Sequence, residues 1–142
     1  MKIRELHIKD IDTVVELWYE TSVVAHNFIP VAYWEKNKKV MASNYLPNSE
    51  TYLAVEDDRI YGFISMVEDY LAAIFVSNEM QGNGIGKKLL NFIKEKRTTI
   101  QLRVYNKNTK SIEFYKSQDF SIISESQEEE TGEYELLMEW RK

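Results

Sequence analysis

A glycine-rich segment, Gln81-Gly82-Asn83-Gly84-Ile85-Gly86, lies between the apolar run Ala72–Val76 and an apolar stripe with helical spacing. The run predicts a strand, and the stripe predicts a helix that begins at the glycines; its members are Ile85, Leu89, Phe92 and Ile93. The first N–H groups of a helix are unpaired and lie at the positive end of its dipole, and glycines let an anion approach them. The segment therefore predicts a phosphate-binding loop.

The spacing of the glycines argues against two common nucleotide sites. In a Walker A loop the first glycine would stand where Gln81 is, and a Ser or Thr would stand where Lys88 is. In a dinucleotide fingerprint the third glycine would come one residue later than Gly86. That fingerprint also follows the first strand of its unit, whereas this segment follows the fourth expected strand. ATP binding of the P-loop kind and NAD binding are both disfavoured.

The remaining sequence predicts one alternating series of strands and helices. The expected strands are residues 2–8, 52–55, 60–67, 71–76, 100–104, 120–124 and 134–140. The other expected helices are 11–25, capped by Asp10, 30–46, and 109–117, capped by Asn108. Short polar turns join the second, third and fourth strands, so these should be antiparallel. We expect an α/β or α+β mixed three-layer domain over residues 1–142, and not a doubly wound sheet.

The composition excludes several classes of site. The 142 residues contain no Cys and only two His, so we expect no disulfide framework, no cysteine nucleophile and no metal. The net charge of −5 opposes binding to nucleic acid. The first residues resemble no signal peptide, and no apolar run approaches the ~20 residues of a membrane span, so a cytoplasmic protein without a membrane segment is expected.

Two spaced motifs identify a family. Gln81, Gly84 and Gly86 match the pattern Gln/Arg-x-x-Gly-x-Gly/Ala, and Asn108 is followed at the family's spacing by Tyr115 and Phe120. In both motifs the chain resembles the GNAT N-acetyltransferase superfamily. Ser111 replaces the family's small Ala, and Asp119 replaces the Gly before Phe120. Asp tolerates the left-handed conformation better than most residues, so the second change is compatible with the fold.

The resemblance implies a mixed, mostly antiparallel sheet flanked by about four helices, with acetyl-CoA as cosubstrate. It also implies that Ile74, Phe75 and Val76 pair through their backbone with the pantetheine arm, and that Asn108 contacts this arm. The strand that contains Val76 should diverge from the strand that begins near Ile100. Residues around the pyrophosphate would be Gln81, Gly82, Asn83, Gly84, Ile85, Gly86 and Lys87.

Transfer of an acyl group to an amine requires a neutral nucleophile, a polarised thioester carbonyl and a proton for the departing thiolate. The resemblance assigns the proton to Tyr115, whose ordinary pKa of about 10 lies above the ~8.5 of a thiol. Spacing alone would make Tyr115 a packing residue of its helix. The base is open between Glu68, Asp69, His26 and a chain of waters, and His26 also fits a purely structural role.

The acceptor is expected to be an amine on a small molecule, a peptide N-terminus or a lysine side chain. An acidic chain suits a cationic acceptor, and the loops around residues 25–46 and 126–134 should decide which one binds. A monomer and a homodimer both fit the sequence. The alternative function is a catalytically silent domain that binds acyl-CoA as a sensor or an interaction module.

Overall fold

The computed structural model describes residues 1–142 and contains one seven-stranded sheet in the order β1-β2-β3-β4-β5-β7-β6. The strands are β1 (Lys2–Glu5), β2 (Glu50–Glu56), β3 (Arg59–Val67), β4 (Tyr70–Val76), β5 (Thr99–Tyr105), β6 (Ser121–Gln127) and β7 (Tyr134–Arg141). The expected hairpins from β2 to β4 are confirmed, because these strands pair antiparallel in sequence order.

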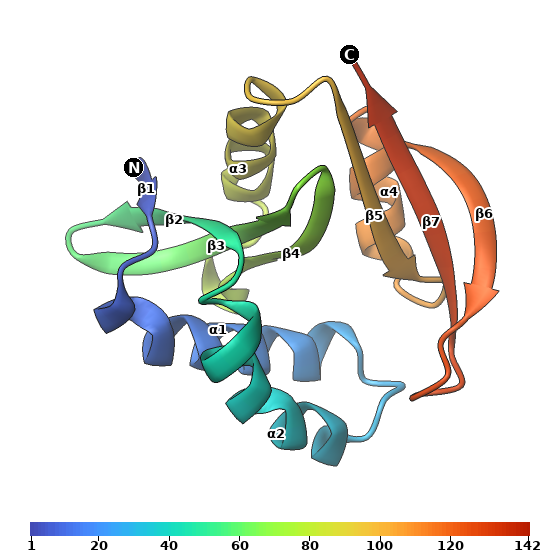
Figure 1. Cartoon of the computed structure of the whole chain (residues 1–142), viewed down its shortest axis with the longest axis horizontal. Helices are drawn as coiled ribbons and strands as arrows, with labels where there is room; N and C mark the ends of the chain where they lie inside the picture. The colour runs from blue at the N-terminus through green and yellow to red at the C-terminus, as the bar shows by residue number, and fades with distance from the viewer.

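Helices cover both faces of this sheet, as Figure 1 shows. The α-helices are α1 (Ile11–Ala25), α2 (Val31–Val40), α3 (Ile85–Lys94) and α4 (Thr109–Ser117). Helices α1 and α2 lie on one face, and α3 and α4 lie on the other. The mixed three-layer α/β fold predicted from the sequence is therefore confirmed. None of the helices combines the length and the apolar character needed to cross a membrane.

The sheet is split between its two central strands. β4 and β5 form the single parallel pair of the sheet, and they pair only at Tyr70 with Gln101 and at Leu71 with Leu102. Beyond these two pairs the strands diverge toward their C-terminal ends (Figure 1). The predicted divergence of the strand that contains Val76 is confirmed. The split thus has a closed end on the Tyr70–Leu71 side and an open end on the Val76 side.

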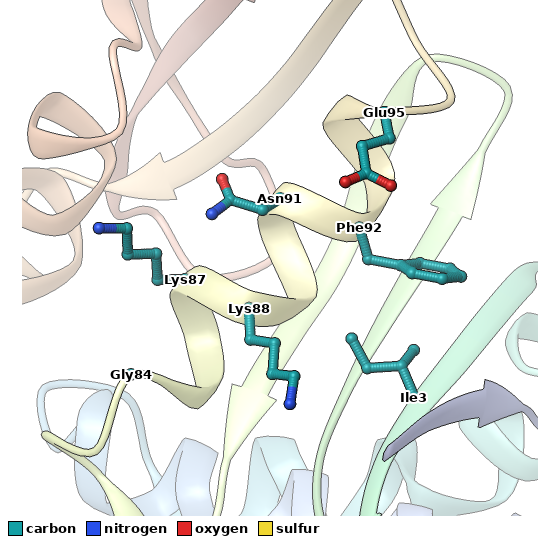
Figure 2. A pocket seen from close by; sticks show the side chains of 7 residues that line it. All are labelled: Ile3, Gly84, Lys87, Lys88, Asn91, Phe92 and Glu95. Atoms are coloured by element: carbon teal, nitrogen blue, oxygen red, sulfur yellow. The ribbon is translucent and has the colours of Figure 1, made fainter. Parts of the chain in front are cut away.

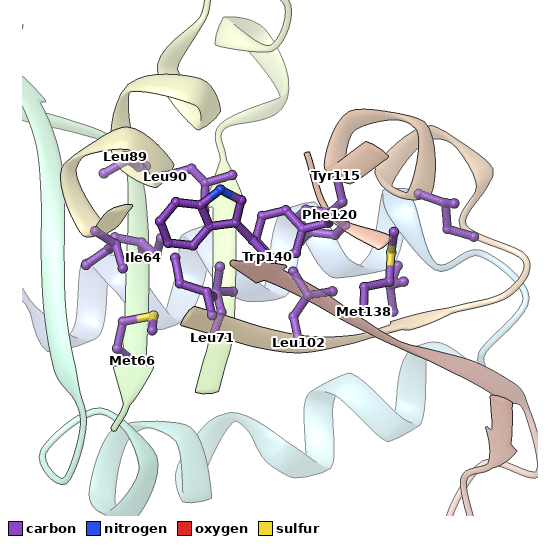
Figure 3. Packing of buried hydrophobic residues seen from close by; sticks show 14 of the residues in the cluster. Ile64, Met66, Leu71, Leu89, Leu90, Leu102, Tyr115, Phe120, Met138 and Trp140 are labelled. Atoms are coloured by element: carbon purple, nitrogen blue, oxygen red, sulfur yellow. The ribbon is translucent and has the colours of Figure 1, made fainter. Parts of the chain in front are cut away.

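A continuous apolar core holds the two halves of the split sheet together. This α3/α4 core contains Leu71 of β4, Leu102 of β5 and Leu89 and Leu90 of α3, together with Tyr115 (Figure 3). A second core under α1 and α2 includes the fully buried Leu53 and Phe63. Because the first core has side chains from both halves, it fixes their relative position beyond the two residue pairs that join β4 and β5.

The N-terminal region differs from expectation at Asp10. The first strand ends at Glu5, and Ile8–Asp10 form a 3-10 turn, η1, before α1. The Asp10 side chain does not cap α1; it accepts the His7 N–H at 2.9 Å and pairs with Arg4 at 2.8 Å. The prediction of an Asp10 cap on α1 is wrong because the carboxylate is used by the turn before the helix and by Arg4.

The helix expected over residues 30–46 is shorter and changes its winding. α2 ends at Val40 and continues as a π-helical turn, η2 (Met41–Tyr45), in which the Leu46 N–H bonds the Met41 carbonyl at 3.0 Å. Pro30 precedes the helix as its N-cap residue and does not lie in the first turn. The wider turn places both Met41 and Leu46 in the α1/α2 core.

Two local predictions near α4 are confirmed. The Asn108 Oδ1 atom accepts the Ser111 N–H at 3.2 Å, so Asn108 caps the helix. Asp119 adopts a φ of +71°, the left-handed conformation for which the family uses glycine. The last two strands extend slightly beyond their predicted ends, with β6 beginning at Ser121 after the buried Phe120.

Candidate active site

The loop between β4 and α3 carries a continuous series of unpaired backbone N–H groups. After the short 3-10 turn η3 (Asn78–Met80), no N–H from Gln81 to Lys87 donates to an acceptor in the protein. The first helical bond of α3 runs from the Lys88 N–H to the Gly84 carbonyl at 3.0 Å, and no side chain caps the helix. Such a series at a helix N-terminus is suited to an anion with several oxygens.

The glycines of this loop serve two different purposes. Gly82 and Gly84 have φ values of +84° and +79°, and a Cβ atom at either position would meet nothing within 4 Å. They are needed for their left-handed backbone, and the space in front of them is open. At Gly86 a Cβ would lie 3.4 Å from the Phe114 ring, so this glycine allows α3 to pack closely on α4.

The polar side chains of the loop bond to the loop itself. Gln81 Nε2 donates to the Val76 carbonyl at 3.1 Å, and Lys110 Nζ donates to Gln81 Oε1 at 3.2 Å. Asn83 Nδ2 donates to the Met80 carbonyl at 3.1 Å. These predicted site residues therefore fix the shape of the loop, and their backbone N–H groups are left for a ligand.

Two lysines follow the glycines in the first turn of α3 and line a hollow of about 410 Å³ (Figure 2). Lys88 Nζ donates to the Met1 carbonyl at 2.7 Å, whereas Lys87 is exposed and has no ion pair or hydrogen bond. In Figure 2 the two side chains leave the helix in different directions. Lys87 is therefore the cation of this turn that is available to a phosphate.

The backbone of β4 faces the split at alternate residues. The Ser77 N–H bonds the Tyr61 carbonyl of β3 at 2.8 Å, and the Phe75 carbonyl lies close to Gly62 of the same strand. Since neighbouring residues of a strand direct their N–H and carbonyl groups to opposite edges, those of Ile74 and Val76 face the split. Of the three strand residues predicted to hold pantetheine, Ile74 and Val76 are oriented for it, and the backbone of Phe75 is used by β3.

Tyr115 lies in the α3/α4 core with its hydroxyl still accessible. The side chain is 8% exposed, and its ring packs against Phe120 with centroids 5.7 Å apart (Figure 3). The hydroxyl makes no hydrogen bond within the protein and is not among the enclosed polar atoms that lack a partner, so the exposed fraction includes it. Burial, with a smaller contribution from Tyr70 at the closed end, raises the pKa of Tyr115 above its ordinary value.

Asn108 contacts His26, which the sequence left open between a base and a structural residue. Asn108 Nδ2 lies 3.3 Å from His26 Nε2. The imidazole is 9% exposed and stacks on Trp34 with centroids 5.2 Å apart. Burial lowers the pKa of His26 to about 4. A ring that is neutral at pH 7, with Nε2 already engaged, is a poor general base.

The other two candidate bases lie in the turn between β3 and β4, before the closed end of the split. Asp69 forms an ion pair with Arg97 at 3.3 Å, and the Glu68 carbonyl accepts from the same guanidinium at 3.1 Å. This turn is separated from the open part of the split by the paired residues Tyr70 and Leu71. No group of three or more His, Cys, Asp or Glu side chains that could hold a metal ion is present.

A second hollow, of about 380 Å³, lies where the α1–α2 loop meets the β6–β7 loop. Its lining comes from the α1–α2 region and from the β6–β7 loop: Phe28, Ile29, Pro30, Ala32, Tyr33, Lys36, Glu130 and Thr131. These are the two loop regions expected to decide the acceptor. Burial, followed by Glu128 and Glu130, raises the pKa of Tyr33 to about 12.

The β6–β7 loop, which supplies Glu130 and Thr131 to this hollow, also makes a contact with β5 that the sequence did not indicate. Glu128 Oε1 accepts from the Tyr105 hydroxyl and from the Thr131 hydroxyl, both at 2.8 Å. Tyr105 ends β5, and its ring meets His26 edge-on with centroids 5.2 Å apart. No local pattern could have revealed this contact, because the end of β5 and the β6–β7 loop meet only in the folded chain.

Comparison with known proteins agrees with the motifs and the split sheet. The family model described as "Acetyltransferase (GNAT) domain" matches residues 19–141. The chain is 33% identical to the peptidyl-lysine N-acetyltransferase YiaC of Escherichia coli over 97% of this chain and 95% of that protein. Its fold is similar to apo YjaB of Escherichia coli (TM-score 0.87, 20% identity, 98% and 96% of the two chains).

It is also similar to the PaiA N-acetyltransferase of Thermoplasma acidophilum, which was solved with coenzyme A. That similarity has a TM-score of 0.81 at 21% identity and covers 99% of this chain and 98% of the other. The family match spans most of the sequence and includes both motifs and the divergent strands β4 and β5. The chain therefore belongs to the GNAT family of acetyltransferases.

Proposed function

We propose that this acetyltransferase moves the acetyl group of acetyl-CoA to the primary amine of a lysine side chain in a peptide or protein. The observation that carries the proposal is the series of free N–H groups from Gln81 to Lys87, together with the open edge of β4 at Val76 and Ile74. A ligand with a pyrophosphate and an arm of amides matches both parts. The coenzyme A held by the Thermoplasma relative supports this choice.

Different residues of this chain would contact different parts of the cofactor. The backbone from Gly82 to Lys87 would hold the pyrophosphate, with the free Lys87 ammonium adding charge. The N–H groups of Ile74 and Val76 would bond the pantetheine arm, and one of them would polarise the thioester carbonyl. Asn108 lies at the start of α4, where its amide can meet the same arm. Acetyl-CoA supplies the activated acyl group.

Tyr115 acts in this proposal as the general acid. The amine nitrogen forms a bond to the acetyl carbon, the carbon–sulfur bond breaks, and the departing sulfur takes a hydrogen bond and then a proton from the Tyr115 hydroxyl. A raised pKa keeps this hydroxyl protonated until sulfur charge develops. His26 is held against Asn108, and Asp69 pairs with Arg97 in the β3–β4 turn, where Glu68 also lies, beyond the closed end of the split. In this proposal the proton released by the amine therefore passes to water, and Tyr115 recovers its proton from water.

The lysine acceptor is supported by two observations. The relative with 33% identity is named a peptidyl-lysine N-acetyltransferase. The hollow between the α1–α2 and β6–β7 loops combines the aromatic rings of Phe28 and Tyr33 with the carboxylate of Glu130, which pairs with the ammonium of Lys36 at 3.2 Å. An aliphatic chain that ends in an ammonium group packs on rings and pairs with carboxylates. The same features also admit a peptide N-terminus, so the test must separate the two.

The test uses three peptides of the same length, incubated with acetyl-CoA while thiol release is followed. One has a blocked N-terminus and a lysine, one has a free N-terminus and no lysine, and one has neither amine. We expect thiol release and a mass gain of one acetyl group only with the lysine peptide. Turnover only with the peptide that has a free N-terminus would show that the acceptor is an N-terminal amine and not a lysine side chain. Calorimetric binding of CoA without turnover on any amine would favour the silent acyl-CoA-binding domain.

A further inference from the structure

The contact between Asn108 and His26 joins elements from the two opposite faces of the sheet. α1 ends at Ala25, and His26 follows it on the α1/α2 face. α4, which packs on the other face, begins directly after Asn108. The two side chains meet at 3.3 Å although they are 82 residues apart in the sequence. The contact therefore links the α1–α2 loop to the helix that carries Tyr115.

The geometry fixes the direction of this hydrogen bond. Asn108 Oδ1 accepts the Ser111 N–H at 3.2 Å, so the other end of the amide, its NH₂ group, faces His26. The imidazole Nε2 must then accept, which places the ring proton on Nδ1. Nδ1 is enclosed and makes no hydrogen bond of good geometry, although the nearby Ser22 carbonyl at the end of α1 favours a proton on the ring. A second proton on the ring would remove the Nε2 acceptor.

Aromatic side chains hold the imidazole in this orientation from three elements. Trp34 of α2 stacks on it at an interplanar angle of 28°, Tyr105 of β5 meets it edge-on at 75°, and Phe28 of the α1–α2 loop does so at 81°. The imidazole is 9% exposed, so it has little freedom to rotate away from Asn108. Its acceptor is therefore preorganised.

We propose that His26 is a positioning residue: its Nε2 holds the Asn108 amide, and through it the first turn of α4, so that the Tyr115 hydroxyl meets the thioester sulfur. This inference rests on the proposed role of Tyr115. Tyr115 follows Asn108 by seven residues, which is about two helical turns, so the two residues lie on nearly the same side of α4. A displacement of the first turn therefore moves the Tyr115 side chain along with it.

Two substitutions of His26 separate positioning from packing. His26→Phe keeps an aromatic ring of similar shape but has no acceptor, whereas His26→Gln keeps an acceptor near the Nε2 position and loses the ring. We expect kcat to fall about fivefold to tenfold in His26→Phe, as for the loss of one hydrogen bond, and to recover largely in His26→Gln. The KM for acetyl-CoA should change less than kcat. The opposite order, with Phe active and Gln impaired, would show that His26 only fills space.

A second measurement does not depend on turnover. Amide hydrogen exchange at Ser111 and Ile112 reports the first turn of α4, because both N–H groups bond to Asn108. Exchange at these amides should be faster in His26→Phe and close to wild type in His26→Gln. Unchanged exchange in His26→Phe would overturn the positioning role. Failure of the proposed function would instead appear as wild-type protein that acetylates no amine, whatever the exchange result.

The matched control replaces the partner. Asn108→Ser keeps a side-chain cap for α4 but is too short to reach His26. In that background the further change His26→Phe should not lower kcat or increase exchange again, because the bond is already lost. A full additional effect of His26→Phe in the Asn108→Ser protein would show that His26 acts by another route.

Discussion

Tyr115 combines a buried ring with a hydroxyl that is free of protein partners. The ring belongs to the α3/α4 core, so the side chain cannot follow a ligand over a wide range of positions. The hydroxyl keeps its proton because burial raises its pKa. In the proposed reaction Tyr115 would therefore act as a fixed hydrogen-bond donor, and its contribution should appear in the rate of the chemical step and not in cofactor binding.

Tyr115→Phe should lower kcat by about 10²-fold to 10⁴-fold, the usual range for removal of a general acid. The dissociation constant of CoA, measured by calorimetry, should remain within about twofold, because the lost hydroxyl touches only the sulfur region. Tyr52→Phe is the matched control: it removes the hydroxyl of another core tyrosine, on β2, away from the split. Full turnover in Tyr115→Phe would refute the acid assignment.

His26 should make the stability of the fold sensitive to mild acid. Its pKa is about 4 in the folded protein against an ordinary 6.5, so the unfolded chain binds more protons between these values. The contribution of the neutral imidazole to the free energy of unfolding is therefore fully present above pH 6.5. It is lost as the pH falls toward 4, by up to about 3 kcal/mol. Urea denaturation of wild type and His26→Gln at pH 7.5, 6 and 5 measures this effect. The free energy of unfolding should fall less steeply with decreasing pH in the variant than in wild type. Parallel pH profiles would contradict the buried neutral state.

At the scale of elements, the proposed binding of pyrophosphate by the loop before α3 would depend on backbone conformation. Gly84 and Gly132 form a natural pair for testing this, because both have positive φ and open space around their Cβ positions. Gly84 lies at the N-terminus of α3, and Gly132 lies in the β6–β7 loop. Their substitution introduces the same kind of strain at sites with and without free N–H groups.

Gly84→Ala and Gly132→Ala should each lower the free energy of unfolding by about 1 kcal/mol, the cost of a Cβ in the left-handed region. Only Gly84→Ala should weaken CoA binding, by about tenfold or more, because its strain turns the N–H groups away from a common point. Calorimetric titration with CoA measures the difference. Equal CoA affinity in the two variants would mean that the loop does not bind the pyrophosphate.

Elements whose signals are local can be predicted from the sequence. The Asn108 cap and the hairpins from β2 to β4 depend on residues a few positions apart, and the structure has them as expected. The prediction for Asp10 is wrong because Arg4 and the His7 N–H compete for its carboxylate, and propensity does not include such partners. The π-helical turn is not predictable locally, because it serves the packing of Met41 and Leu46 in a core that only the complete fold forms.

At the scale of the whole molecule, the site depends on the split between β4 and β5. The two strands share only two residue pairs, and the backbone of Ile74 and Val76 has no strand partner on that side. The motifs predicted which elements flank the split. They did not predict the contact of His26 with Asn108 or that of Glu128 with Tyr105, because each joins segments far apart in the sequence.

Binding of CoA should therefore stabilise the fold and protect the open edge of β4. At a CoA concentration one hundred times the dissociation constant, binding adds about 2.7 kcal/mol to the free energy of unfolding. This gain raises the Tm by about 5–10 °C for a chain of this size. Hydrogen exchange at Ile74 and Val76 should slow on binding more than exchange at Phe75, whose backbone already faces β3. Slower exchange confined to strands other than β4 would show that the pantetheine arm of CoA binds elsewhere.

The free N–H groups from Gln81 to Lys87 and the open edge of β4 have a consequence for how the enzyme responds to its surroundings. None of the loop groups would touch the acyl portion of the cosubstrate, so the CoA left after transfer keeps nearly all of the same contacts. CoA should thus compete with acetyl-CoA at comparable concentration. The rate of acetylation would then follow the ratio of acetyl-CoA to CoA in the cell, and with the proposed lysine acceptor the extent of modification would record how much activated acetate is present.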